Sequence, residues 1–203
     1  MMLQLERIGK QFDGRKVLDG VSFGLERGEV AGLLGCNGAG KTTLLRIVCR
    51  LLEPDSGSVV FDGHPMSQAD LREVGYLPEE RGLYRGMGVE EQAVYLASLK
   101  GLSRRQARQE VGQWFARLGM EEWRGRKAGQ LSKGMQQRLQ FVVAVAHRPR
   151  LLILDEPFSG FDAASADMLR REVRRLAEGG TAVLLSTHNL EAVETMCTKT
   201  LQL

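Results

Sequence analysis

Apolar residues recur with two different periods along this chain. Segments at 3–8, 17–25, 29–34 and 58–61 have the patterns of β-strands, and Gly or Asp-Gly turns bound them. From Lys41 the apolar residues instead recur at helical spacing as far as Leu52, and the turn residues at 53–57 end the pattern. This part of the chain is therefore predicted to hold strands with one helix among them, and 74–77 adds a further strand.

The middle of the chain has helical signals alone. Between Gly88 and about Arg126 the β pattern is absent, and residues 89–100 and 103–118 are predicted to be helices with charged outer faces. A helix at 132–146 follows, and then buried strands at 151–154 and 181–186 flank a helix from the N-cap Asp162 to about Glu178. This alternation predicts one α/β domain with a mostly parallel sheet and a helical insertion at about 88–129.

Composition and charge are those of an ordinary soluble domain. The 203 residues are 43% hydrophobic and 26% charged, which excludes a disordered or fibrous chain, and the net charge of +3 is too small to predict nucleic-acid binding. The three cysteines form no C-x-x-C pair, so neither a disulfide framework nor a zinc site is predicted, and a reducing cytoplasm fits best. The longest apolar run, 141–146, is too short to span a membrane. Glycine is in excess, with 24 residues, which indicates backbone that lies close to a ligand.

A phosphate-binding loop is predicted at 35–42. The pattern G-x-x-x-x-G-K-[ST] follows a predicted strand and opens a predicted helix, as such a loop requires. Backbone N–H groups and the helix N-terminus would meet phosphate oxygens, Lys41 would neutralise the β- and γ-phosphates, and the Thr42 hydroxyl can bind Mg²⁺. The loop consists of Gly35, Cys36, Asn37, Gly38, Ala39, Gly40, Lys41 and Thr42.

Two acids end the buried strand at 151–154. Asp155 and Glu156 are therefore predicted to lie at the carboxyl edge of the sheet, where ligands of open α/β sheets bind. Asp155 is placed to hold Mg²⁺ and Glu156 to polarise a water molecule. Strands often end in an acid that only caps the next helix, and the phosphate loop is what favours the catalytic interpretation.

Residues 131–138 distinguish between the classes of phosphate-loop protein. With the loop and the acidic strand end, this run resembles the signature motif of ABC transporter ATPases, and it reads Leu131-Ser132-Lys133-Gly134-Met135-Gln136-Gln137-Arg138. Further motifs of that family have counterparts here in the same order, at Phe12, at 76–79 for the Q-loop, at 159–162 for the D-loop and at 186–188 for the switch histidine. Ser132 is a helix N-cap signal, so its helix offers a second anion site that cannot reach its own phosphate loop.

The resemblance implies the architecture and the chemistry of an ABC ATPase domain. The P-loop NTPase core would comprise about 1–87 and 130–203, with an N-terminal antiparallel β subdomain, and the insertion would be an α-helical subdomain. ATP and Mg²⁺ are the implied cofactors, held in a head-to-tail homodimer or pseudo-dimer. Glu156 and His188 would be catalytic, and Thr42, Glu79 and Asp155 would hold the metal. Other ATP contacts would come from Phe12 on adenine, the phosphate loop with Thr43, and Ser132, Gly134, Gln136 and Asp162.

The Q-loop indicates a branch of the family. Glu79 stands where the family usually has Gln, and together with 80–84 this resembles the bacterial sodium and drug exporter branch. Glu80 is the competing Q-loop residue. The implied function is an ATP-hydrolysing subunit that powers an ABC exporter through an integral membrane permease. Such a subunit would be cytoplasmic, peripheral on the inner face of the cell membrane, and no nucleic-acid partner is expected.

Other interpretations differ from this one in class. The alternative is a cytosolic ABC-type ATPase that acts on ribosomes or DNA, although those relatives usually carry two nucleotide domains or a long coiled coil. A G protein or a kinase would not explain 131–138, and no Asn-Lys-x-Asp motif occurs.

Cys36 stands where the family usually has a small residue, which makes the loop a candidate for oxidation. Relatives of this branch continue past the counterpart of Leu203, so the resemblance implies a core or truncated member.

Overall fold

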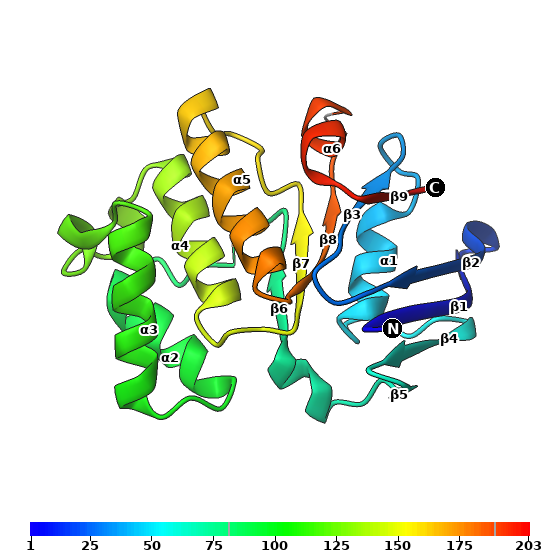
Figure 1. Ribbon diagram of the computed structural model, residues 1–203, viewed down its shortest axis with the longest axis horizontal. Helices are drawn as coiled ribbons and strands as arrows, with labels where there is room; N and C mark the ends of the chain where they lie inside the picture. Colours follow the sequence, from blue (N-terminus) through cyan, green and yellow to red (C-terminus); the bar gives the residue numbers. More distant parts are fainter. Residues whose placement is uncertain (81, 189) are drawn as a thin grey trace.

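A five-stranded parallel sheet lies at the centre of the computed structural model, which describes residues 1–80, 82–188 and 190–203 (Figure 1). Its strands lie in the order β6-β7-β8-β3-β9, and their bounds are β3 (Val30–Leu34), β6 (Val74–Leu77), β7 (Leu151–Asp155), β8 (Ala182–Ser186) and β9 (Lys199–Gln202). Every residue of β7 and β8 is buried. Their continuous apolar runs are explained by burial on both faces of the sheet.

Helices cover both faces of this sheet. In Figure 1, α4 (Lys133–Val145) and α5 (Ala163–Glu178) lie on one side, and α1 (Lys41–Val48) lies on the other. The short helix α6 (Leu190–Met196) precedes β9. Leu154 and Leu169 belong to the apolar core on the α4 and α5 side, whereas Leu44 and Leu184 belong to the core on the α1 side. The two faces of the sheet therefore have separate cores.

An antiparallel sheet packs on the outer side of α1. It has the order β2-β1-β4-β5, and its strands are β1 (Leu3–Phe12), β2 (Arg15–Leu25), β4 (Ser56–Phe61) and β5 (His64–Pro65). Leu3 and Leu5 of β1 share the core of α1, so this helix lies between the two sheets (Figure 1). The packing positions the end of β1, with Phe12, near the start of α1.

The helical part of the chain projects from the side of α4 and α5 that faces away from the central sheet (Figure 1). It contains α2 (Val89–Leu99), α3 (Arg104–Arg117) and two short 3₁₀ turns, η2 (Glu121–Trp123) and η3 (Ala128–Gln130). A bridge between Gly88 and Lys127 brings its two ends together, and the Val89 N–H donates to the Arg126 carbonyl at 2.9 Å. Within the described part of the chain, no helix combines the length and the apolar character that a membrane span needs.

The predicted fold class is confirmed, and two local predictions are corrected. The helix that begins at Lys41 ends at Val48 rather than at Leu52. Arg50 adopts a left-handed conformation with φ of 52°, and the Leu51 N–H donates to the Arg46 carbonyl at 2.9 Å, which closes the helix. Glycine usually marks such an end, and an arginine at this position does not predict it. The strand predicted to stop at Ile8 extends to Phe12, and β5 and the 3₁₀ turn η1 (Ala69–Glu73) were not predicted.

Candidate functional site

The carboxyl ends of the parallel strands bring the predicted motifs together. Asp155 at the end of β7 pairs with Ser186 at the end of β8, and Ser186 also pairs with Leu33 of β3. The phosphate loop follows β3, and His188 follows β8 by two residues. On the other side of β7, β6 leads to Glu79. Segments far apart in the sequence therefore converge on one edge of the sheet, as ligand sites of open α/β sheets require.

A cavity of about 430 Å³ occupies this edge. Its walls join the end of β1, the phosphate loop, the start of α1, the segment after β6 and the end of β7. The lining residues are Phe12, Val17, Asn37, Gly38, Gly40, Lys41, Thr42, Thr43, Glu79, Asp155 and Glu156. This volume is in the range of small-molecule and cofactor sites. Most of the ATP and metal contacts predicted within one chain thus face a single space.

The phosphate loop has the backbone that its glycines permit. Gly40 caps α1 with φ of 98°, and a Cβ at this position would come within 2.9 Å of the Val17 carbonyl oxygen. The Lys41 side chain folds back over the loop, where Nζ donates to the carbonyls of Gly35 at 2.7 Å and Cys36 at 3.1 Å. These contacts hold the ammonium group against the loop. It therefore lies beside the N-terminus of α1, whose first N–H groups can bind an anion.

Asp155 carries an unused acceptor into the same region. Its side chain is 1% exposed, one carboxylate oxygen accepts a hydrogen bond from the Ser186 hydroxyl, and Oδ2 has no hydrogen-bond partner among the described residues. A buried carboxylate oxygen without a partner is costly unless a cation or a water molecule meets it. The hydroxyl of Thr42 and the carboxylate of Glu79 line the same cavity.

This donor set fits Mg²⁺. No group of three or more His, Cys, Asp or Glu side chains is arranged to hold a metal in residues 1–80, 82–188 and 190–203. Mg²⁺ does not need such a group, because it binds through one or two carboxylates together with substrate phosphates and water. The described residues therefore suit a metal that arrives with a nucleotide rather than a resident metal centre.

Glu156 is held in a fixed position beside the cavity. It adopts φ of 48°, and its N–H donates to the Ser186 carbonyl at 3.1 Å, so the left-handed backbone is supported by β8. Its Oε1 lies 3.0 Å from Nδ1 of His188. Since a carboxylate only accepts, the proton of this bond is on Nδ1. The Glu156 side chain is 13% exposed and that of His188 71%, so the histidine covers the acid from the solvent side.

The two candidate Q-loop acids occupy different places. Glu79 lines the phosphate-loop cavity, whereas Glu80 lines a neighbouring cavity of about 300 Å³, which Glu79 and Asp155 also line. The Glu80 carbonyl accepts a hydrogen bond from Gln140 Nε2 at 3.3 Å. Arg81, the next residue of this motif, lies outside the described residues. The geometry thus favours Glu79 over Glu80 as the acid nearer to bound phosphate.

Comparison with known proteins identifies the family. The family model described as ABC transporter matches residues 18–159. The chain belongs to the ATP-binding proteins of ABC transporters. It is 44% identical to an ABC transporter ATP-binding protein, YhaQ, of Bacillus subtilis (strain 168) over 97% of this chain and 66% of YhaQ. It is 34% identical to the Nod factor export ATP-binding protein I of Burkholderia thailandensis over 96% of this chain and 65% of that protein. The family and the predicted enzyme class, an ATPase, are confirmed.

A solved structure supports the same assignment. The structure of an ATP-binding subunit of an ABC transporter superposes on all of this chain and on 86% of its own, with a TM-score of 0.92 and 30% identity. The chain spans about two thirds of the length of the curated relatives it matches, 66% of YhaQ and 65% of the Nod factor protein.

The ABC signature residues lie apart from the phosphate-loop cavity. Ser132 caps α4, where its Oγ accepts the Met135 N–H at 3.3 Å, and the first turn of the helix carries Gly134. Gln136 donates to the Leu131 carbonyl at 3.1 Å and lines a separate cavity of about 440 Å³. These side chains are not among the residues that line the phosphate-loop cavity of the same chain.

The D-loop aspartate is likewise a helix cap. Asp162 accepts the Ser165 N–H at 2.7 Å at the start of α5, and this bond holds the pKa of its carboxyl below the usual range. Its predicted contact with ATP, like those of Ser132, Gly134 and Gln136, stays a prediction about a second copy of the chain.

Two functional positions were missed from the sequence. Val17 of β2 lines the phosphate-loop cavity, and Ser186 holds both the Asp155 carboxylate and the Glu156 N–H. A hydroxyl residue that ends a wholly apolar strand could have indicated Ser186, because a polar group buried there needs a partner. Val17 has no such signal, since its place in an alternating strand predicts only a core contact.

Proposed function

We propose that this chain is the ATP-binding and ATP-hydrolysing subunit of an ABC exporter and that it works as a head-to-tail dimer. One observation carries the proposal: the residues suited to bind a nucleotide fall into two sets that a single chain does not bring together. Lys41 and Asp155 face one cavity, whereas the capped N-terminus of α4 at Ser132 opens elsewhere. A second copy in head-to-tail orientation supplies the missing half of each site.

Different residues of this chain bind the phosphates, hold the metal and accept the proton. Lys41 exchanges its bonds to loop carbonyls for phosphate oxygens, while the N–H groups of the loop bind the same phosphates. Thr42, Asp155 and Glu79 would hold Mg²⁺, which supplies charge neutralisation at the phosphates. Glu156 accepts a proton from the attacking water, and His188 keeps this carboxylate oriented through Nδ1.

The surface beside the Q-loop has the features of a contact with a partner protein. The cavity of about 300 Å³ beside Glu79 and Glu80 is also lined by Leu51, which is 64% exposed. Tyr84, in the segment between the Q-loop and α2, is 60% exposed. Exposed large apolar side chains beside a polar loop are typical of a protein interface. We assign this surface to an integral membrane permease, which places the chain at the inner face of the cell membrane. Export as the direction rests on similarity to the Nod factor export protein.

The experiment that tests this function measures phosphate release by the purified chain at a series of protein concentrations. If two chains form each active site, the rate in Mg²⁺ and ATP rises with the square of the protein concentration while monomers predominate. A rate that stays strictly proportional to protein concentration over this whole range would mean that one chain is sufficient. The variant Glu156→Gln measures the background of contaminating ATPases.

The role of Glu79 gives a separate prediction. Replacing Glu79 with alanine should raise the Mg²⁺ concentration that gives half-maximal ATPase rate by about three- to tenfold, because one oxygen ligand is lost from a site shared with phosphates and water. Glu79→Gln keeps a side-chain oxygen and should keep ATPase activity. Glu80→Ala is the matched control, since Glu80 does not line that cavity. Equal half-maximal concentrations for wild type, Glu79→Ala and Glu80→Ala would show that neither acid approaches the metal.

A further inference from the structure

A second cavity lies at the opposite edge of the parallel sheet from the phosphate loop. Its volume is about 560 Å³, and it is bounded by α3, the C-terminal end of α4 and the C-terminal end of α5. Two of its residues, Arg150 and Thr181, directly precede β7 and β8. It shares no lining residue with the phosphate-loop cavity, so the proposed ATPase function leaves it unexplained.

Arginine is the commonest residue in the lining of this cavity. Glu110 is the one acid among the described lining residues. Against this one acid stand five guanidinium groups, those of Arg27, Arg117, Arg148, Arg150 and Arg175. Guanidinium groups stay charged at any physiological pH. The lining side chains carry an excess of four positive charges (5 − 1). Asp62, Glu73 and Glu172 pair with these arginines from outside the lining, so the excess over all paired acids is one (5 − 4).

Glu110 and Glu172 lie beneath the arginines they pair with, whereas Asp62 and Glu73 are slightly more exposed than their partner Arg150. Arg148 forms a bidentate pair with Glu110, and the arginine side chain is 72% exposed whereas the glutamate is 12% exposed. Glu172, 18% exposed, accepts a single hydrogen bond at 3.0 Å from Nε of Arg175, which is 45% exposed. The recorded ion pairs engage one or two nitrogens of each guanidinium, and each group has five N–H donors. The pairs thus hold the arginines in place and leave further N–H donors of each guanidinium outside these contacts.

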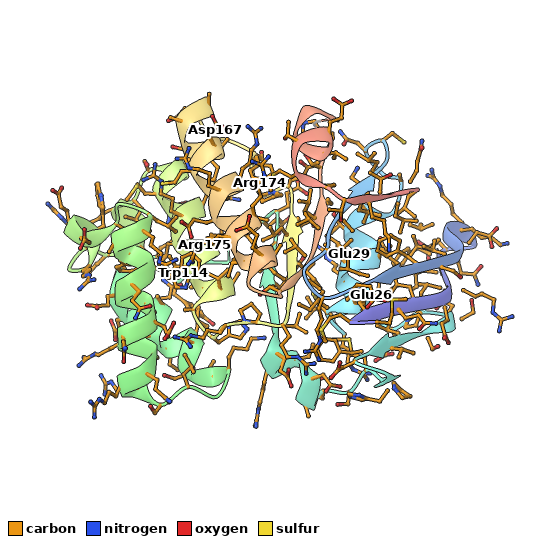
Figure 2. The ribbon with its side chains drawn as sticks, in the orientation of Figure 1. Glu26, Glu29, Trp114, Asp167, Arg174 and Arg175 are labelled. Carbon is orange, nitrogen blue, oxygen red and sulfur yellow. The ribbon has the colours of Figure 1, made fainter. Side chains whose placement is uncertain are left out.

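An aromatic ring makes one wall rigid. The guanidinium groups of Arg117 and Arg175 lie 5.4 Å and 5.5 Å from Trp114 ring centres, and Figure 2 shows Trp114 of α3 beside Arg175 of α5. Trp114 is 5% exposed, so the ring supports the arginines rather than offering a stacking surface. Cation–π contacts and ion pairs preorganise the donors, which lowers the entropic cost of binding an anion.

We propose that this cavity binds a small ligand that carries two or more phosphate groups. The volume is in the range of small-molecule sites, and the planar fork of arginine matches phosphate oxygens in a bidentate manner. Cations near helix C-termini also stabilise helices, but that effect is confined to the last turn and does not explain Arg27, which precedes β3. Binding of this ligand does not depend on the proposed ATPase function, whereas a regulatory place for it does.

The position of the site links it to the nucleotide. α4 and α5 end at this cavity, and they begin at Ser132 and Asp162, the caps that are predicted to face ATP across the dimer. A bound anion that draws the C-terminal ends of the two helices together would change the relative position of their N-terminal ends. The ligand is therefore assigned a regulatory place rather than a catalytic one.

The test is a titration with inorganic tripolyphosphate, followed by the fluorescence of Trp114. Lys41→Ala removes binding at the phosphate loop, and Trp123→Phe leaves Trp114 as the sole tryptophan, since the sequence contains two. In this background Arg27→Gln with Arg148→Gln removes the two most exposed cavity arginines. Arg105→Gln with Arg171→Gln is the matched control, because both residues are exposed arginines outside the cavity. Thermal melts verify that all proteins are folded.

We expect saturable binding of tripolyphosphate that weakens about tenfold or more in Arg27→Gln/Arg148→Gln and is unchanged in the control pair. A second arm uses vesicles of phosphatidylglycerol, with sedimentation as the readout. Loss of sedimentation in the cavity variant, without tripolyphosphate binding in the background protein, would make a lipid headgroup the source of the phosphates. Equal behaviour of the two double variants toward both probes, or binding of neither probe, overturns the proposal.

Discussion

Replacing Lys41 with alanine is expected to abolish productive ATP binding, whereas replacing His188 with alanine leaves binding nearly intact and slows turnover. Lys41 is buried against the phosphate loop and faces charge that ATP already carries in the ground state. Loss of two charge-assisted hydrogen bonds should raise the dissociation constant for ATP by at least about a hundredfold. Of the two variants, we therefore expect only Lys41→Ala to lower the affinity for ATP.

His188 acts later in the reaction. Its contact in the free protein is with Glu156 at 3.0 Å rather than with the phosphate loop, and its side chain is 71% exposed. The dissociation constant of His188→Ala should thus stay within about twofold of wild type, while the turnover number falls on the order of a hundredfold, as for a group used in the transition state. Binding of a fluorescent ATP analogue and phosphate release give the two quantities. An equal loss of affinity in both variants contradicts this division of roles.

Glu156→Gln is expected to stop hydrolysis without stopping ATP binding. The amide keeps the shape of the side chain and an oxygen that can accept from His188 Nδ1, but it cannot take a proton from water. Loss of a general base should lower the turnover number by about 10²–10⁴-fold. ATP then persists in the site, so the state that ATP stabilises accumulates. Phosphate release measures the first effect, and retention of nucleotide after gel filtration measures the second.

Glu156→Asp serves as the matched control for this variant. It keeps a carboxylate but shortens the side chain, so an intermediate turnover number is expected if proton transfer depends on the position of the acid. If Glu156→Gln hydrolyses ATP at the wild-type rate, Glu156 is not the general base.

The sequence predicted the phosphate side of the site because its chemistry is local. The loop, the strand before it and the helix after it are contiguous, so residues 35–42 carry both the ligand contacts and the backbone geometry. Asp155 and Glu156 could be assigned for a related reason, since a buried parallel strand ends at the ligand edge of the sheet whatever its neighbours are.

Features that depend on tertiary contacts were harder to predict. The end of α1 rests on Arg50 in a left-handed conformation, whose guanidinium donates to the Met66 carbonyl, and a pattern of apolar residues cannot indicate such a residue. The bulges of β1 let it pair with β2 as far as Phe12, which alternation alone did not show. Ser132 and Asp162 fulfil their predicted capping roles in one chain, but a contact with ATP needs a second chain that one sequence does not position.

The arginines of the distal cavity illustrate the same limit. Arg27, Arg148 and Arg175 come from distant parts of the sequence, and only the fold places them around one space. In the sequence these arginines stand among other charged residues, so no local pattern predicts that they share a cavity.

The mass of Glu156→Gln in solution decides whether ATP joins two chains. By light scattering, we expect a particle near the chain mass of 22.5 kDa without nucleotide and one of twice that mass in Mg²⁺ and ATP. Ser132→Arg in the same background should prevent the increase, because it removes the cap hydroxyl and fills with a long side chain the space at the N-terminus of α4 where the phosphates of the partner copy are predicted to bind. A particle that stays at the chain mass with ATP demonstrably bound would contradict the head-to-tail dimer.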